Sequence, residues 1–137
     1  AGDSRIYQIR GNEVRFVTED HSLVNELVKR KDITPEEALT HPRRNVILRA
    51  ISGMEPSRLD VKVITDIQKG DYFILMTDGI LDGIPETAML NLFRSKLTAE
   101  KMKEKINQAC VESSKDNYSM YMFRVKDLQR QPLPLKQ

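Results

Sequence analysis

The five apolar residues at positions 72–76 constrain the fold of this chain more than any other feature. The run lies between two turn signals, Gly70-Asp71 before it and Asp78-Gly79 after it. A short apolar run is typical of a strand that is buried on both faces, although a buried piece of helix has the same composition. The flanking turns favour the strand. The sequence therefore predicts a central strand that is covered on both sides.

The sequence predicts more strands at residues 5–10, 13–18, 45–51, 61–67 and 118–125. Residues 5–10 and 61–67 alternate between polar and apolar side chains, as a half-buried strand does. The strands at 5–10 and 13–18 flank Gly11-Asn12 and would form a hairpin. Several of these strands follow one another with no helix between them, which disfavours a purely parallel, alternating sheet. We expect an α+β fold with layered, mainly antiparallel sheets flanked by helices.

Capping residues predict four helices. Ser22 can cap a short one, and Thr34-Pro35-Glu36-Glu37 combines a cap, a proline at the first helical position and a glutamate three residues after the cap. A third helix would begin at Pro85-Glu86. A fourth would follow Thr98, with an apolar stripe of Met102, Ile106, Ala109 and Cys110.

Composition excludes several classes of protein. The 22 basic and 20 acidic side chains give a net charge of only +2, so no nucleic-acid partner is expected. No apolar run approaches the roughly 18 residues of a transmembrane helix, so no membrane partner is expected for this segment. The first ten residues do not resemble a secretory signal, and Cys110 has no second cysteine with which to form a disulfide. These observations predict a cytoplasmic location.

Three aspartates lie where predicted strands begin or end. Asp3 precedes the first strand, Asp78 follows the apolar strand, and Asp116 precedes the last one. If they converge, they would repel one another unless a cation lay between them, and Mg²⁺ and Mn²⁺ prefer carboxylate oxygens. The alternative is that each is an ordinary turn residue, because aspartate beside glycine or asparagine is common in turns. The pattern alone leaves both readings open.

Five segments, taken in order, carry a resemblance to a known family. They are Gly2-Asp3-Ser4-Arg5, Asp20-His21-Ser22, residues 33–47, Thr77-Asp78-Gly79 with the apolar strand before it, and Asp116-Asn117. Together they resemble the metal-dependent, type 2C serine/threonine protein phosphatases, particularly the bacterial members. The resemblance implies a type 2C-like β-sandwich, here a partial domain. Residues 1–127 would be its C-terminal portion, with a flap-like segment at about 31–47, and residues 128–137 would be a loose tail.

The resemblance also implies the chemistry. The family hydrolyses phosphoserine and phosphothreonine with water activated by Mn²⁺ or Mg²⁺, without a catalytic side chain beyond that water. Asp78 and Asp116 would be ligands of the binuclear centre, and Asp3 would hold a weaker third metal together with Asp78. Arg43 and Arg44 are weak candidates for binding the phosphorylated substrate, with solvated surface charge as the plainer reading.

The family's upstream half, which supplies the remaining metal ligands, has no counterpart in this sequence. We therefore expect the chain to represent a truncated domain that is inactive alone, binds metal weakly and self-associates through exposed strand edges. The alternative function is a noncatalytic phosphatase-like module that binds a phosphoprotein or a regulatory partner. The related phosphatases that act on sigma-factor regulators are disfavoured by the flap-like segment.

Overall fold

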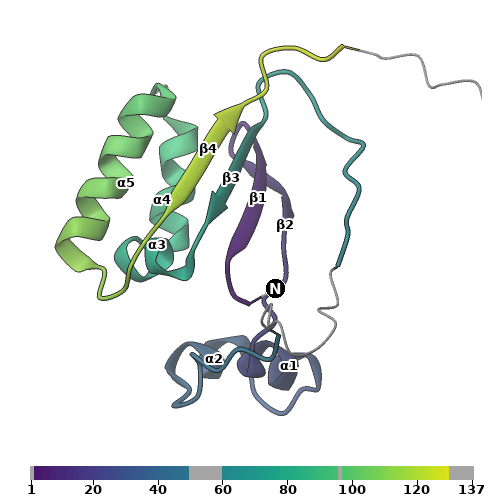
Figure 1. Ribbon diagram of the computed structural model, residues 1–137, viewed down its shortest axis with the longest axis vertical. Coiled ribbons are helices and arrows are strands. Elements are labelled where there is room, and N and C mark those ends of the chain that lie inside the picture. The colour runs from purple at the N-terminus through teal and green to yellow at the C-terminus, as the bar shows by residue number, and fades with distance from the viewer. Residues whose placement is uncertain (1, 50–59, 96, 130–137) are drawn as a thin grey trace, which may run out of the picture.

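The computed structural model describes residues 2–49, 60–95 and 97–129. In these residues the chain forms four strands and five helices (Figure 1). In order, they are β1 (Arg5–Arg10), β2 (Glu13–Val17), α1 (Leu23–Lys29), α2 (Pro35–Thr40), β3 (Tyr72–Met76), α3 (Asp78–Gly83), α4 (Glu86–Arg94), α5 (Ala99–Ser113) and β4 (Met120–Arg124). Most of the tail at 128–137 lies outside the described residues.

One antiparallel sheet organises the described part of the chain. Its strand order is β2-β1-β3-β4, so the apolar strand β3 is central, as predicted. The predicted hairpin is confirmed as β1 and β2, with an irregularity in pairing between Gln8 and Ile9. Leu75 of β3 pairs with Ile6 on one side and with Tyr121 on the other. Paired residues share a face of the sheet, so this register decides which side chains meet.

The core lies on the face of the sheet that α3, α4 and α5 cover (Figure 1). Tyr7, Ile9 and Ile74 point toward these helices and are at most 1% exposed. The predicted stripe of α5 meets them through Met102, Ile106 and Cys110. The α+β class is therefore confirmed, with one helical layer on one antiparallel sheet in the described residues.

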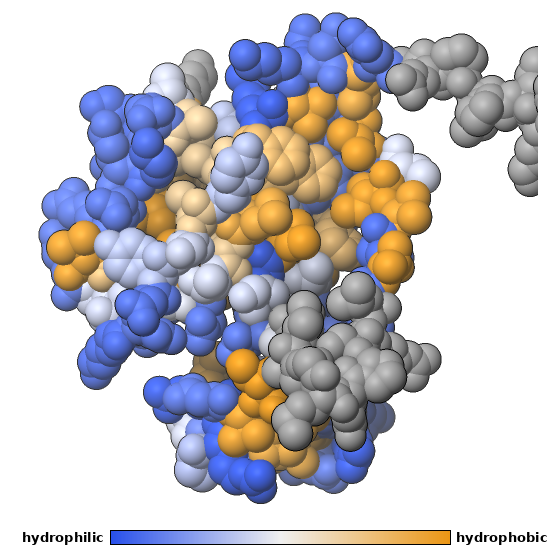
Figure 2. Space-filling model, viewed as in Figure 1, coloured by the Kyte–Doolittle hydropathy of each residue, from blue (hydrophilic) through white to orange (hydrophobic). Residues whose placement is uncertain are grey.

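The opposite face of the sheet is open in the described part of the chain. Leu75 is 39% exposed and Tyr121 is 66% exposed, while Phe123 stacks on Phe73 with ring centroids 5.3 Å apart. Figure 2 shows hydrophobic surface over the strands beside the largely hydrophilic helices. The prediction that both faces of the apolar strand are covered is therefore wrong here. The reason is that α3–α5 pack on a single face, while α1 and α2 lie at one end of the sheet (Figure 1).

The predictions of strands at 45–51 and 61–67 are also wrong. Asn45 lies in a turn, and Ile47 makes only an isolated bridge with Ser22, while residues 50 and 51 lie outside the described part. The segment 61–67 forms no ladder, and Val61 is 86% exposed. A strand forms only where a neighbouring edge supplies a run of hydrogen-bond partners. Among the described residues, the first segment has only the two backbone bonds of its single bridge, and 61–67 pairs with no strand.

The four predicted helices are confirmed as α1, α2, α4 and α5. Ser22, Thr34 and Thr98 each accept a hydrogen bond from a backbone N–H in the first turn of their helices. Helix α3 was not predicted, because Asp78-Gly79 reads as a turn and the six residues have no apolar period. None of the helices in the described part has both the length and the apolar character needed to cross a lipid bilayer.

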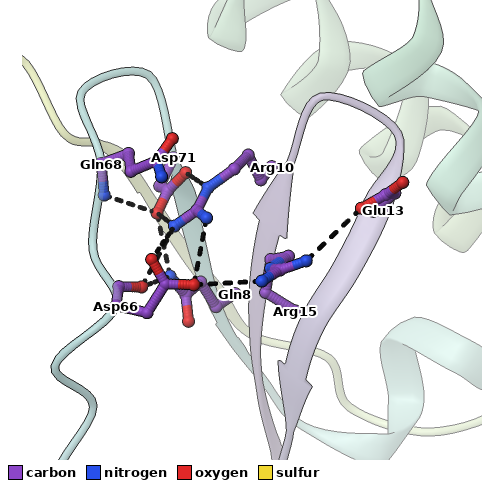
Figure 3. A network of polar contacts seen from close by, with 7 residues as sticks. All are labelled: Gln8, Arg10, Glu13, Arg15, Asp66, Gln68 and Asp71. Atoms are coloured by element: carbon purple, nitrogen blue, oxygen red, sulfur yellow. Dashed lines mark hydrogen bonds and ion pairs between the residues drawn. The ribbon is translucent and has the colours of Figure 1, made fainter.

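A polar network fixes the residues that lead into β3 (Figure 3). The Asp71 carboxylate is fully buried and accepts hydrogen bonds from Arg10 at 2.8 and 2.9 Å, from the Gln8 amide at 2.9 Å and from the Gln68 N–H at 2.9 Å. Arg10 also binds Asp66. The hydrogen bonds from Arg10 lower the pKa of Asp71 to about 2. The network therefore joins the segment before β3 to the neighbouring strand β1.

We expect Asp71→Asn to lower the free energy of unfolding and to weaken the dependence of that free energy on pH. The folded-state pKa lies below the ordinary 3.8, so the charged carboxylate stabilises the fold above about pH 4, and this contribution disappears as pH falls toward 2. The loss in the variant at pH 7 should be about 2 kcal/mol, measured by urea unfolding from pH 2 to 7. Asp127→Asn, an exposed change, is the control. An unchanged pH profile in Asp71→Asn would contradict this account.

Candidate metal centre

Asp78 lies at the junction between β3 and α3. The preceding Thr77 joins this junction to the start of β4, because its N–H donates to the Ser119 carbonyl at 3.0 Å and its hydroxyl accepts the Ser119 N–H at 3.0 Å. These two bonds extend the β3–β4 pairing past the last residues of the ladder. Asp78 therefore leaves the sheet beside the loop that connects α5 to β4.

Asp116 lies in that loop, between α5 and β4. The Ser114 hydroxyl is 2.8 Å from the Gly79 carbonyl, and the Lys115 N–H donates to the Asp82 carboxylate at 2.6 Å. The Asp116 carboxylate itself accepts the Asn117 N–H at 2.7 Å. These contacts place the loop against α3, whose first residue is Asp78.

Gly79 makes this close approach feasible. A Cβ atom at this position would lie 2.4 Å from the Asn117 carbonyl oxygen and 3.0 Å from its carbonyl carbon. Both are backbone atoms, which cannot move aside as the end of a flexible side chain can. Gly79 lies within α3 and supplies space for the loop that carries Asp116.

Asp3 approaches from the first strand. Arg5 of β1 pairs with Met76 of β3 in antiparallel register, so the residues before Arg5 run alongside those that follow Met76. Gly2 adopts a positive φ of 76°, and its carbonyl accepts the His21 N–H at 2.8 Å. The sheet register therefore directs Asp3 toward the same end of β3 as Asp78.

The electrostatics indicate that the three carboxylates face a common region. Partial burial raises the pKa of Asp78, and the negative charges of Asp3 and Asp116 raise it further. No described basic side chain forms an ion pair with any of the three (the ion pairs found involve other acids). Three like charges without a counter-charge form an arrangement that a cation would stabilise.

The donor atoms suit a hard divalent cation, because all are carboxylate oxygens. Among the described residues, however, no group of three or more His, Cys, Asp or Glu side chains has an arrangement that could hold a metal ion. The three aspartates thus supply suitable donors without forming a complete set of ligands. The remaining ligands would be water or residues beyond those described.

The flap-like arginines, Arg43 and Arg44, are exposed in the turn after α2. No hydrogen bond in the described residues joins their side chains to the aspartates. The contacts of Asp82 and Ser114 were not predicted. Asp82 follows Asp78 by four residues, a spacing that places both on one face of a helix, but this signal is visible only once α3 is known.

We expect Gly79→Ala to destabilise the fold, because the added Cβ would overlap the Asn117 carbonyl. The free energy of unfolding should fall by about 2–3 kcal/mol, measured by urea denaturation. Gly11→Ala is the matched control, since Gly11 has a positive φ of 60° but no atom within 4 Å of the added Cβ, and it should lose only about 1 kcal/mol. Equal losses in the two variants would show that the contact with Asn117 is unimportant.

Comparison with known proteins gives a consistent result in sequence and fold. No protein-family model matches the chain. A putative type 2C protein phosphatase of Streptococcus pyogenes is 38% identical over 120 residues, which are 87% of this chain and 48% of that protein. The chain spans about half the length of the curated relatives it matches.

Solved structures show the same correspondence. The serine/threonine phosphatase Stp1 of Staphylococcus aureus matches with a TM-score of 0.79 and 31% identity, over 92% of this chain and 49% of that one. The catalytic domain of the phosphatase PstP, in complex with two manganese ions, matches with a TM-score of 0.73 and 30% identity, over 92% of this chain and 51% of that one. In sequence and in fold, the chain is therefore similar to bacterial type 2C serine/threonine phosphatases over about half of their length.

Proposed function

We propose that this chain belongs to a metal-dependent phosphatase that hydrolyses phosphoserine and phosphothreonine in proteins. The observation that carries the proposal is the meeting of three segments that bear Asp3, Asp78 and Asp116 at one end of β3. The raised pKa of Asp78 beside the charges of Asp3 and Asp116 supports it. The relatives support it, because they are named serine/threonine phosphatase Stp and protein phosphatase PhpP. The chain spans about half of their length, so the activity is proposed for a protein that also contains the rest of the domain.

The roles of the three aspartates are those that the family resemblance of their motifs implies. Asp78 and Asp116 would bind Mn²⁺ or Mg²⁺ of the main centre, and Asp3 would share a further metal with Asp78. When bound, such ions lower the pKa of water and neutralise the oxygens of the phosphoryl group. The complex of PstP with two manganese ions supports this choice of metal. In this chain, α3 and the loop before β4 would hold the carboxylates in place, and no side chain is assigned as a general acid or base.

The proposal also covers the domain boundaries within the chain. Residues 1–127 would form the C-terminal portion of the domain, with the flap-like segment at about 31–47 bordering the substrate site. Arg43 and Arg44 would then lie in reach of a phosphorylated protein substrate, for which their guanidinium groups are suitable. We also place the protein in the cytoplasm, in keeping with its single cysteine.

Self-association of the isolated chain is part of the same proposal. The outer strands β2 and β4 have one unpaired edge each in the described residues, and the open face of the sheet carries exposed apolar side chains. Light scattering on the purified chain tests this, and a monomer at all concentrations would contradict it.

A noncatalytic role is the second candidate. The described residues contain no complete group of metal-binding side chains, which favours a module that binds a phosphoprotein or a regulatory partner without hydrolysing it. The two functions differ in turnover, so an activity assay separates them.

We expect Mn²⁺-dependent hydrolysis of p-nitrophenyl phosphate and of a phosphothreonine peptide by a protein that joins this chain to the rest of the domain. The chain alone should be inactive. Asp78→Asn should lower kcat about 100-fold, because a lost ligand removes several kcal/mol of transition-state stabilisation. Asp127→Asn, which changes an exposed acid beyond the end of β4, is the control.

Two outcomes would contradict the phosphatase proposal. The first is full activity in Asp78→Asn. The second is a complete absence of turnover in the protein that joins the two halves, combined with binding of the phosphothreonine peptide, which would favour the noncatalytic module.

A further inference from the structure

Helix α3 carries a second carboxylate whose role the proposed function leaves unassigned. Asp82 follows Asp78 by one helical turn, and the two project from the same side of α3. The Asp82 carboxylate accepts the Lys115 N–H at 2.6 Å. Lys115 immediately precedes Asp116, and the loop that contains both passes beside α3 (Figure 1). Asp82 therefore contacts the backbone next to a proposed metal ligand.

Ser114 adds a second attachment of the same loop to α3. Its backbone N–H donates to the Cys110 carbonyl at 2.9 Å and completes the end of α5. Its hydroxyl has several oxygen neighbours but only one proton, and the shortest contact is to the Gly79 carbonyl, at 2.8 Å. The same oxygen lies 3.4 Å from the Asp116 nitrogen and accepts its N–H. Residues 114–116 are thus held at the start of α3 through Gly79 and one turn later through Asp82.

This attachment matters because the carboxylates that it brings together repel one another. Asp78 and Asp116 are both acidic and lie on neighbouring segments, so without a cation the loop is under an outward electrostatic force. A loop with internal hydrogen bonds alone would yield to that force. The Lys115 N–H has its acceptor on helix α3, outside the loop, and this contact resists the displacement of Asp116.

We propose that Asp82 is a positioning residue that acts through the Lys115 backbone N–H to hold Asp116 opposite Asp78 for metal binding. The inference rests on the proposed function, because it concerns the same metal centre. Asp82 acts as a hydrogen-bond acceptor in this role. If its negative charge were what mattered, an asparagine, which keeps the acceptor oxygen but loses the charge, could not replace it.

The test compares Asp82→Asn with Asp82→Ala in the full chain. Mn²⁺ titrations followed by paramagnetic broadening of the Asp78 and Asp116 amide NMR signals report affinity even when binding is weak. We expect Asp82→Ala to weaken Mn²⁺ binding about tenfold, a loss typical of groups that orient a ligand without touching the metal. Asp82→Asn should stay within about twofold of the unaltered chain. Glu112→Ala removes an exposed acid near the end of α5 and is the control.

Hydrogen exchange gives a readout that does not depend on metal. The Lys115 amide should exchange about tenfold faster in Asp82→Ala and at nearly the original rate in Asp82→Asn, since only alanine removes the acceptor. The exchange rates of the core amides of β3 should be unchanged in both variants, which would show that the fold is intact.

The outcomes separate this inference from the proposed function. Loss of Mn²⁺ binding in Asp78→Asn, with none in Asp82→Ala, overturns the positioning role alone. Equal weakening in Asp82→Asn and Asp82→Ala also overturns it, because charge would then be the cause. If Mn²⁺ broadens the Asp78 and Asp116 signals no more than others, or if Asp78→Asn binds Mn²⁺ normally, the metal centre and the positioning role both fail.

Discussion

The contact between Gly79 and the backbone of Asn117 determines how the end of β3 meets the loop before β4. No room exists there for a Cβ, so the first turn of α3 and the loop pack backbone to backbone. The hydrogen bonds between Thr77 and Ser119 hold the same junction from the side of the sheet. As a result, two acidic residues that are distant in sequence, Asp78 and Asp116, lie on neighbouring segments. The register of β1 against β3 brings Asp3 to the same end.

Two aspartates at opposite ends of β3 show how surroundings decide what a carboxylate does. Asp71, just before the strand, is buried against Arg10, which holds its pKa at about 2. Asp78, just after the strand, has acidic neighbours, and burial together with their charges raises its pKa. The first carboxylate stabilises the fold, whereas the second lies where its negative charge is unfavourable. An arrangement that opposes stability in this way is characteristic of functional sites.

Local signals in the sequence predicted much of this fold. Caps such as Thr34 and Thr98 marked helix starts, and the turn at Gly11-Asn12 marked the hairpin. The prediction of a strand at 61–67 failed because an alternating pattern does not show whether a neighbouring strand is there to pair with. Helix α3 was missed because its six residues are stabilised by tertiary packing. For the site, motif order singled out the three aspartates, but the roles of Asp82 and Ser114 depend on contacts across more than 30 residues, which no local pattern reveals.

The central claim is that the charges of Asp3, Asp78 and Asp116 act on one another until a divalent cation neutralises them. An NMR titration of the Asp78 side-chain carboxyl tests it most directly, in the unaltered chain, in Asp3→Asn and Asp116→Asn, and with Mg²⁺ added. The account predicts a pKa above the ordinary aspartate value in the unaltered chain, a lower one in each variant, and a fall when Mg²⁺ binds. An ordinary pKa that neither the substitutions nor Mg²⁺ change would contradict it.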